Sequence, residues 1–322
     1  MAIKGSGSSL SFSEIEAEFG SNGSRSLGAY RLTQNVGSLS NLPLDSGVPT
    51  SGTIKFSDFY GKRLNIVVDC FSGGEETRKI AKNDKWNNNQ VTIIGGFRSK
   101  KEGGSKIIIN VNKKFCSNKD TTSRCALRTG SWDGSSTVQV DVGSSGRILG
   151  SGGDGGRGQN GIDGSAQAGF TGTSGLGIEV NNCTVNVASG GIIRAGFGGG
   201  GGGGGGRQRD KGEDRSASGG GGGGGAGCPP GNGGPRGTTG ALGSDGSAGT
   251  ETTGGGGGGG GNNANQAFGG SGGSGGQAQG GPGGGQGGGG ANGAAIRRTS
   301  GFNVTINNSG TVQGSTNATG TS

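Results

Sequence analysis

The residues best suited to recognition chemistry stand in short segments that interrupt long glycine-rich stretches. These segments comprise a charged run, a Cys-Pro-Pro turn followed by an amide, an amide-rich run with one aromatic, and a pair of arginines. The candidate residues are Arg207, Arg209, Lys211, Arg215, Asn232, Asn263, Asn265, Phe268, Arg297 and Arg298. Planar amides, an aromatic ring and arginines suit the binding of sugars and acidic groups. The alternative is that these segments are solvated turns that keep the protein soluble.

Residue types that enzymes need are scarce or unsuitably spaced. The chain has no histidine, the commonest general base and metal ligand. Glu14, Glu16 and Glu18 are expected on the solvated face of one short helix. A calcium site at Asp154 and Asp163 would lack EF-hand spacing. The many Gly-x-Gly-x-x-Gly matches mean little at this glycine content, and no P-loop lysine motif accompanies them. We therefore expect no enzyme, no cofactor and no metal.

The bulk composition excludes a single large hydrophobic core. Glycine accounts for 88 of the 322 residues, and apolar residues for 26%, against roughly 45–50% in ordinary globular domains. The net charge of +8 suggests an anionic partner. However, the basic residues are scattered among few aromatics, so we expect general surface charge and no nucleic-acid site. We expect no signal peptide, and no apolar run in the sequence is long enough to span a membrane.

The five cysteines do not form a metal-binding or disulfide pattern that the spacing alone identifies. No Cys-x-x-Cys pair occurs, and an odd number cannot close completely within one chain. One interpretation is buried thiols in a protein made in a reducing compartment. A bridge between Cys116 and Cys125 is the other.

The glycines follow two patterns. Residues 198–206, 219–225 and 254–261 are pure glycine, whereas residues 152–166, 231–251, 269–277 and 281–295 repeat Gly-x-y. A period of three is that of the polyproline-II type of helix. We predict a polyglycine-II bundle with the three all-glycine runs at its centre and the triplet segments around them, held by backbone N–H···O=C and Cα–H···O contacts. Collagen, which also needs abundant proline, and disorder are the alternatives.

A second repeat brackets the glycine blocks. Copies that begin at Val140, Val185 and Val304 share an alternating apolar pair, a glycine four residues later and another apolar residue. We predict that each copy is a β-hairpin whose glycine adopts positive φ in the turn. The hairpins would clamp the ends of the bundle.

Residues 1–63 contain a degenerate repeat, in which LSFSEI at residue 10 recurs as IKFSDF at residue 54. Each copy predicts a short helix, with Ser13 and Ser57 as N-caps, and residues 20–53 between them predict loop. A unit of this size has little core of its own, so we expect it to dock on another subunit.

Residues 64–150 predict a small mixed α/β domain. Apolar patterns indicate strands at 64–68, 91–94, 106–111 and 138–142. Residues 75–85 predict a short helix. The expected domains are thus 1–63, 64–150 and a glycine-rich tip at 151–322, and the whole chain is expected to be mostly β and irregular.

Several of these strings resemble glycine-rich bacteriophage tail-fibre and receptor-recognition proteins. They include VQVDVGSSGRILG, VNVASGGIIRAGF and the ending NVTINNSGTVQG, while SLSFSEIEAEFG and GTIKFSDFYG resemble the openings of tail-fibre proteins of marine and cyanobacterial phages. The glycine lattice is similar to the tip adhesins of T-even-type long tail fibres. In that family, polyglycine-II helices stack and variable loops between them touch the host. The N-terminal part departs from those adhesins, which leaves its mode of attachment open.

The resemblance implies a non-enzymatic virion protein at the tip of a tail fibre, assembled in the host cytoplasm. It implies a host receptor, which is a lipopolysaccharide, a glycan or an outer-membrane protein, and contact with other tail proteins through residues 1–63. Homotrimer and monomer on a trimeric fibre both stay open. A structural component that caps or connects fibres without host contact is the alternative, and a glycan depolymerase lacks the clustered carboxylates it would need.

Overall fold

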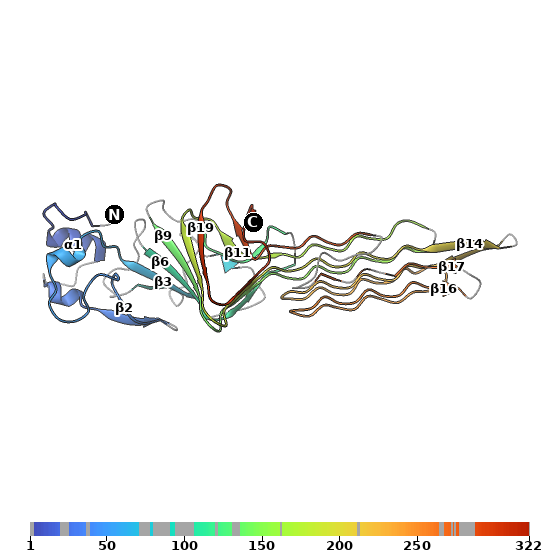
Figure 1. Cartoon of the computed structure of the whole chain (residues 1–322), viewed down its shortest axis with the longest axis horizontal. Helices are drawn as coiled ribbons and strands as arrows, with labels where there is room; N and C mark the ends of the chain where they lie inside the picture. The colour runs from blue at the N-terminus through green and yellow to red at the C-terminus, as the bar shows by residue number, and fades with distance from the viewer. Residues whose placement is uncertain are drawn as a thin grey trace.

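The computed structural model describes residues 3–19, 26–36, 39–70, 78–79, 91–93, 106–119, 122–130, 136–161, 163–210, 213–263, 267–271, 273, 275–276 and 287–321. The molecule is elongated, with an N-terminal module at one end, a stack of β-strands next to it, and glycine-rich segments running side by side to the other end (Figure 1). Among the described residues, helices occur only in the N-terminal module. This confirms the prediction of a mostly β and irregular chain.

The N-terminal module has a small aromatic core. Its elements are α1 (Phe12–Phe19), the 3-10 helices η1 (Leu27–Tyr30) and η2 (Phe56–Phe59), and the antiparallel strands β1 (Thr33–Val36) and β2 (Leu39–Pro43). The rings of Phe19, Tyr30 and Phe59 are buried and pack edge to face, with centroids 5.7 to 6.3 Å apart. Ile108, from a strand of the neighbouring stack, is buried in the same core. The module therefore packs directly on the rest of the chain.

The predicted N-caps are wrong by two residues. Ser11 precedes α1, and its backbone N–H donates to Glu14 Oε2 at 2.8 Å in a capping-box contact. Lys55 precedes η2, and its N–H donates to Asp58 Oδ2 at 2.7 Å. Each helix therefore begins earlier than expected because the acidic residue, rather than the serine in the middle of the motif, satisfies the exposed backbone donor.

Two further expectations for the module are wrong. Residues 20–53 are not all loop, because they contain η1, β1 and β2, and Tyr30 and Leu44 are buried in the core. Glu18 does not lie on a solvated face: it is 1% exposed, and its Oε1 accepts a hydrogen bond from the backbone N–H of Leu64 at 2.8 Å. A buried carboxylate is tolerated there because it satisfies a buried backbone donor.

Parallel strands form three sheets, and the chain moves to a different sheet at each successive strand between residues 106 and 194 and again between residues 296 and 319. The first sheet, in spatial order, contains β19 (Val304–Asn308), β12 (Cys183–Val187), β9 (Thr137–Val142), β6 (Lys106–Val111), β3 (Asn65–Cys70) and the antiparallel β5 (Val91–Ile93). The second contains β20 (Thr311–Gln313), β13 (Ile192–Arg194), β10 (Arg147–Leu149) and β7 (Lys114–Cys116). The third contains β21 (Ala318–Thr319), β18 (Ile296–Arg298), β11 (Ser174–Ile178), β8 (Cys125–Arg128) and β4 (Arg78–Lys79). The stack is thus a three-sided parallel β-solenoid.

The solenoid core follows from the alternation of side chains along each strand. In β9, Val138, Val140 and Val142 are buried, whereas the residues between them face outward. Val140 lies in register with Ile109 of β6 and Val185 of β12. Equivalent apolar positions of successive coils therefore stack on one another and form one continuous core.

The predicted β-hairpins are corners of this solenoid instead. In each repeat the first strand belongs to the first sheet and the second strand to the second sheet, as with β9 and β10. The corner needs glycine because a Cβ at Gly146 would overlap the carbonyl oxygen of Val111 in the preceding coil. The predicted positive φ is wrong for the repeat glycines Gly146, Gly191 and Gly310, none of which has one. Gly190, which precedes Gly191, has a φ of +87°, which favours glycine.

The strands on either side of residue 150 belong to the same sheets. Residues 64–150 and 151–322 were expected to be separate domains, but β9 pairs with β12 and β8 with β11. The predicted helix at 75–85 lies outside the described residues except for Arg78–Lys79, which form β4. A mixed α/β unit is therefore not what the described residues of 64–150 build.

The glycine-rich segments are insertions within two solenoid coils. One lies between β10 and β11, and the longer one lies between β13 and β18. Their backbones exchange hydrogen bonds at every third residue: Gly219, Gly222 and Gly225 donate to the carbonyls of Gln159, Gly156 and Gly153 at 2.8 to 2.9 Å. Residues 219–227 donate to residues 153–159, 244–250 and 270–276, and they accept from residues 197–203, 231–237 and 255–258. This segment therefore has neighbours on all sides.

Two of the three all-glycine runs lie at the centre of the array, as predicted, and the third does not. Residues 198–204 and 219–225 are buried, whereas residues 254–261 alternate between buried and exposed. At Gly256 a Cβ would meet only Ser247 Oγ, at 3.5 Å. The run at 254–261 is thus an edge segment, and two of its glycines, Gly256 and Gly259, are not required by packing.

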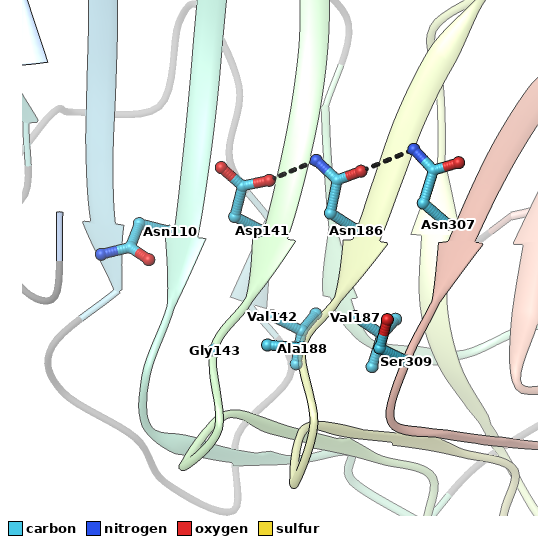
Figure 2. A pocket seen from close by; sticks show the side chains of 9 residues that line it. All are labelled: Asn110, Asp141, Val142, Gly143, Asn186, Val187, Ala188, Asn307 and Ser309. Carbon is cyan, nitrogen blue, oxygen red and sulfur yellow. Dashed lines mark hydrogen bonds between the residues drawn. The ribbon is translucent and has the colours of Figure 1, made fainter.

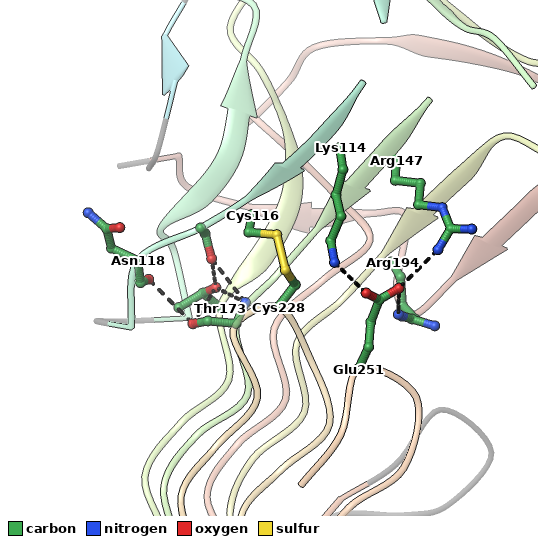
Figure 3. The surroundings of a disulfide bond; sticks show 10 residues. Lys114, Cys116, Asn118, Arg147, Thr173, Arg194, Cys228 and Glu251 are labelled. Atoms are coloured by element: carbon green, nitrogen blue, oxygen red, sulfur yellow. Dashed lines mark hydrogen bonds and ion pairs between the residues drawn. A yellow bond between two sulfur atoms is a disulfide. The ribbon is translucent and has the colours of Figure 1, made fainter. Parts of the chain in front are cut away.

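Cys116 forms a disulfide with Cys228, so the predicted Cys116–Cys125 bridge is wrong, and the expectation of buried thiols is wrong for these two bonded cysteines (Figure 3). The bond links β7 of the solenoid to the turn that follows residues 219–227, across 112 residues of sequence. Cys125 is a free, buried thiol, as is Cys183. The folded topology brings Cys116 to Cys228, which no local spacing indicates.

A group of charged residues makes a second link between the solenoid and the glycine-rich segments (Figure 3). Glu251 lies in the turn between two of these segments and contacts cations from three consecutive coils: Lys114 Nζ at 2.6 Å, Arg147 Nη1 at 3.2 Å and Arg194 Nη2 at 3.3 Å.

Among the residues that the structure describes, no helix is long and apolar enough to cross a membrane.

Candidate functional site

Loops from four parts of the sequence meet at the end of the molecule remote from the N-terminal module. The hairpin of β14 (Gly206–Asp210) and β15 (Glu213–Ala217) and the pair β16 (Asn262–Asn263) and β17 (Ala267–Phe268) lie at this end (Figure 1). β17 lies beside both β14 and β15. Residues 160–161 and the turn at residues 238–242 contact them. We call this region the distal surface.

Backbone contacts hold these loops together. Ala241 donates its N–H to the carbonyl of Ser216 and accepts from Ser218, both at 2.9 Å. The N–H and hydroxyl of Thr238 donate to Asn160 Oδ1 at 2.9 and 3.2 Å. Gly206 lies so close to the backbone of Phe268 that a Cβ would overlap its carbonyl oxygen. The loops are thus fixed relative to one another by the same close packing as the glycine segments.

The side chains of the distal surface combine apolar and cationic groups. Phe268 is 63% exposed and Leu242 is 51% exposed, although both are large apolar side chains. Arg207 is exposed and Arg215 is half-buried. A surface with exposed aromatic, aliphatic and guanidinium groups can stack on a ring, bury apolar area and hydrogen-bond to acidic or hydroxyl groups.

The structure brings together some of the predicted site residues and separates others. Arg207, Arg215 and Phe268 lie on the distal surface, as do the backbones of Arg209 and Asn263. Lys211 and Asn265 lie outside the described residues.

Asn232, Arg297 and Arg298 lie at the solenoid end. The N–H of Asn232 donates to Asp154 Oδ1 at 2.6 Å. Arg297, in β18, donates from Nε to Ser174 Oγ at 3.1 Å. The candidate residues therefore occupy two separate surfaces.

Sequence reasoning missed Leu242 and the neighbouring Thr238 and Thr239, all exposed. The available signal was an isolated leucine in a Gly-x-y stretch of otherwise small and polar residues. Such a leucine has no hydrophobic core to join, so its exposure could have been predicted from the sequence.

Catalytic chemistry has little support in the described part of the chain. No group of histidine, cysteine, aspartate or glutamate residues there could hold a metal ion. Burial raises the pKa of the Cys125 and Cys183 thiols to about 12, so neither is a thiolate at neutral pH. Both thiols lie in solenoid strands rather than on the distal surface.

A comparison with known protein families identifies the family of this chain. The family model described as phage tail fibre adhesin Gp38 matches residues 75–317. The chain therefore belongs to the phage tail fibre adhesin Gp38 family, which confirms the resemblance seen in its sequence.

A solved structure is also similar to this chain. It is the gp37-gp38 adhesin tip complex of the bacteriophage S16 long tail fiber, with 22% sequence identity and a TM-score of 0.41, covering 98% of this chain and 99% of that one. No curated protein sequence matches the chain.

Proposed function

We propose that this protein is a non-enzymatic adhesin at the tip of a phage tail fibre and that its distal surface binds a receptor on the host cell. The observation that carries this proposal is the exposure of Phe268 and Leu242 beside arginines, at the end farthest from the N-terminal module. Family membership supports an adhesive role. Loops on a rigid scaffold are also where binding residues concentrate.

This surface suits a receptor that carries acidic, hydroxyl or amide groups together with apolar groups. Arg207, Arg209, Lys211 and Arg215 would contact acidic groups, and Asn263 and Asn265 would hydrogen-bond to hydroxyls or amides. Phe268 with Leu242 would pack on a sugar face or an apolar protein loop. These properties fit lipopolysaccharide, a glycan or an outer-membrane protein.

The glycine-rich segments would form a polyglycine-II lattice that holds the distal loops rigidly. Support comes from the hydrogen bonds at every third residue and from the six neighbouring segments of residues 219–227, since three residues per turn is the period of this helix type. Rigid support matters because ordering flexible loops on binding would weaken the affinity.

The N-terminal module would attach the protein to other tail proteins, within residues 1–63. Leu10, Phe12, Ile54 and Phe56 are half-buried around its core and come from the two copies of the sequence repeat. An apolar surface at the end opposite the distal loops suits a docking role. Attachment as a monomer or in a trimer is compatible with this arrangement, and assembly would take place in the host cytoplasm before the virion is complete.

Adsorption of the phage to its host tests this proposal. We expect the triple substitution Arg207→Ala, Arg209→Ala, Arg215→Ala to abolish adsorption while the protein stays folded and on the virion. Arg298→Ala, at the solenoid end, is the matched control and should adsorb normally. Loss of adsorption in Arg298→Ala alone would move the contact to the surface that contains Asn232, Arg297 and Arg298. Wild-type protein that neither binds cells nor blocks infection would instead favour a fibre connector.

A further inference from the structure

A pocket of about 370 Å³ lies on the outer face of the first solenoid sheet (Figure 2). This sheet is remote from the distal surface (Figure 1). Its polar lining comes from four strands, which contribute Asn110, Asp141, Asn186 and Asn307. These residues occupy the same register position in β6, β9, β12 and β19. The polar side chains therefore form a row that runs across the strands.

The row of side chains has a defined hydrogen-bond direction (Figure 2). Asn307 Nδ2 donates to Asn186 Oδ1 at 2.8 Å, and Asn186 Nδ2 donates to Asp141 Oδ1 at 2.7 Å. An ionised carboxylate only accepts hydrogen bonds, so Asp141 requires the amide nitrogen of Asn186 to face it. With the amide nitrogen of Asn186 facing Asp141, its oxygen faces Asn307, and this fixes the orientation of the Asn307 amide.

Because the hydrogen bonds of the row run from Asn307 towards Asp141, Asn307 at the outer end of the row can still accept a hydrogen bond. Asn307 is exposed, and its Oδ1 accepts no hydrogen bond from the residues that the structure describes. The amide nitrogens of Asn186 and Asn307 each have a second N–H, because each donates one bond within the row. The pocket thus offers donors and acceptors side by side, which suits hydroxyl groups, since a hydroxyl both donates and accepts.

The charge, the apolar lining and the volume of the pocket restrict the class of ligand that it can bind. Among the residues that line the pocket, Asp141 alone is charged, so the pocket disfavours phosphates and carboxylates. The side chains of Val142 and Val187 are buried in the solenoid core, so the exposed Ala188 is the apolar side chain of the lining that can contact the C–H face of a sugar ring. A volume of about 370 Å³ is near the lower end of the usual ~300–1,000 Å³ for ligand sites.

We propose that this pocket binds a neutral saccharide, with the amides of Asn186 and Asn307 hydrogen-bonding to its hydroxyls. The site lies on the solenoid, and its existence does not depend on receptor binding by the distal surface. It would give the protein a contact with carbohydrate at the side of the molecule rather than at its end.

Saturation-transfer NMR with methyl glucoside, methyl galactoside and N-acetylglucosamine as probes tests this site. We expect the full-length protein to transfer saturation to at least one of them, and glucuronic acid to bind more weakly than methyl glucoside. Asn307→Ala should weaken the affinity about tenfold, which corresponds to the loss of one good hydrogen bond. Thr305→Ala is the matched control, because Thr305 is exposed two residues earlier in β19 and does not line the pocket.

Two outcomes would overturn the proposal: no transfer to any neutral probe, or equal transfer with wild type and Asn307→Ala. Equal binding of glucuronic acid and methyl glucoside would also contradict it. Unchanged thermal unfolding of Asn307→Ala shows that a loss of binding is not a loss of fold. The triple arginine variant of the distal surface should keep full saccharide binding, so failure of the adhesin proposal and failure of this one give different results.

Discussion

Gly222 lies so close to Gly200 of the neighbouring segment that a Cβ on Gly222 would overlap the Gly200 carbonyl oxygen. The N–H of Gly222 at the same time donates to the carbonyl of Gly156 at 2.8 Å. The high glycine content is thus a packing requirement at the centre of the array, where backbone meets backbone and no side chain fits. Hydrogen bonds there take the place of apolar burial.

A methyl group at a central glycine should therefore destabilise the protein, whereas one at the edge should not. We expect Gly222→Ala to lower the free energy of unfolding by at least about 1–3 kcal/mol, the usual range for overpacking. Gly256→Ala is the matched control. Its new Cβ would lie 3.5 Å from Ser247 Oγ, and reduced freedom of the unfolded chain should stabilise the protein by about 0.4–1 kcal/mol.

Thermal unfolding followed by circular dichroism measures both variants. Equal unfolding midpoints for Gly222→Ala and wild type would show that the central segments are not closely packed in solution. A large loss in Gly256→Ala would place residues 254–261 at the centre rather than at the edge.

The period of three and the central position of two all-glycine runs could be predicted from the sequence, because backbone packing imposes a local pattern. The solenoid could not. The alternating valines at Val140 and Val142 predict a strand equally well in a hairpin or in a parallel coil. The strand that pairs with β9 is β12, which follows only after the insertion between β10 and β11. Pairing over such distances leaves no local signal.

The candidate site, like the fold, could be predicted from the sequence only in part. The interrupting segments at residues 207–215 and 262–268 were recognisable because charged, amide and aromatic residues stand out against glycine. Which of them share one end depends on the direction of every intervening segment. Arg297 therefore looked equivalent to Arg207 in sequence, although β18 places it in the solenoid.

Loss of the disulfide between the solenoid and the glycine-rich segments should lower the stability of the folded protein. Cys116 and Cys228 are 112 residues apart, and closing a loop of this length stabilises a fold by about 2–5 kcal/mol. We expect dithiothreitol to lower the unfolding midpoint of wild type and to leave the double variant Cys116→Ala, Cys228→Ala unchanged. A wild-type midpoint that is insensitive to the reductant would show that this bridge does not support the folded state.

The contacts of Glu251 predict a loss of stability in acid. Desolvation, the largest single influence, raises the pKa of Glu251, but the hydrogen bond from Lys114 and the charges of Lys114, Arg194 and Arg147 outweigh it, and the pKa lies below its ordinary value. The stabilisation is therefore complete above the ordinary glutamate pKa of ~4.3 and is lost as the pH falls through the lower, folded-state value.

Glu251→Gln should remove this dependence. We expect it to cost about 1–2 kcal/mol at pH 7, less than a fully buried charged hydrogen bond because Glu251 is partly exposed. Its unfolding midpoint should fall less than that of wild type between pH 7 and pH 3. Asp163→Asn, which removes an exposed carboxylate, is the control and should keep the wild-type acid profile. Parallel profiles for wild type and Glu251→Gln would exclude Glu251 as the acid-sensitive group.

The ring contact between Phe12 and Phe56 predicts where the protein joins the tail. Their centroids are 5.0 Å apart, edge to face, and both side chains are half-buried, so the two repeat copies form one apolar surface. If a tail protein covers it, Phe12→Ser with Phe56→Ser should strongly reduce the protein on purified virions, measured by immunoblot, at a stability loss of about 1–3 kcal/mol. Phe170→Ser is the matched control, because Phe170 is 52% exposed on a glycine-rich segment and should be incorporated normally. Normal incorporation of the double variant would place the attachment surface elsewhere on the molecule.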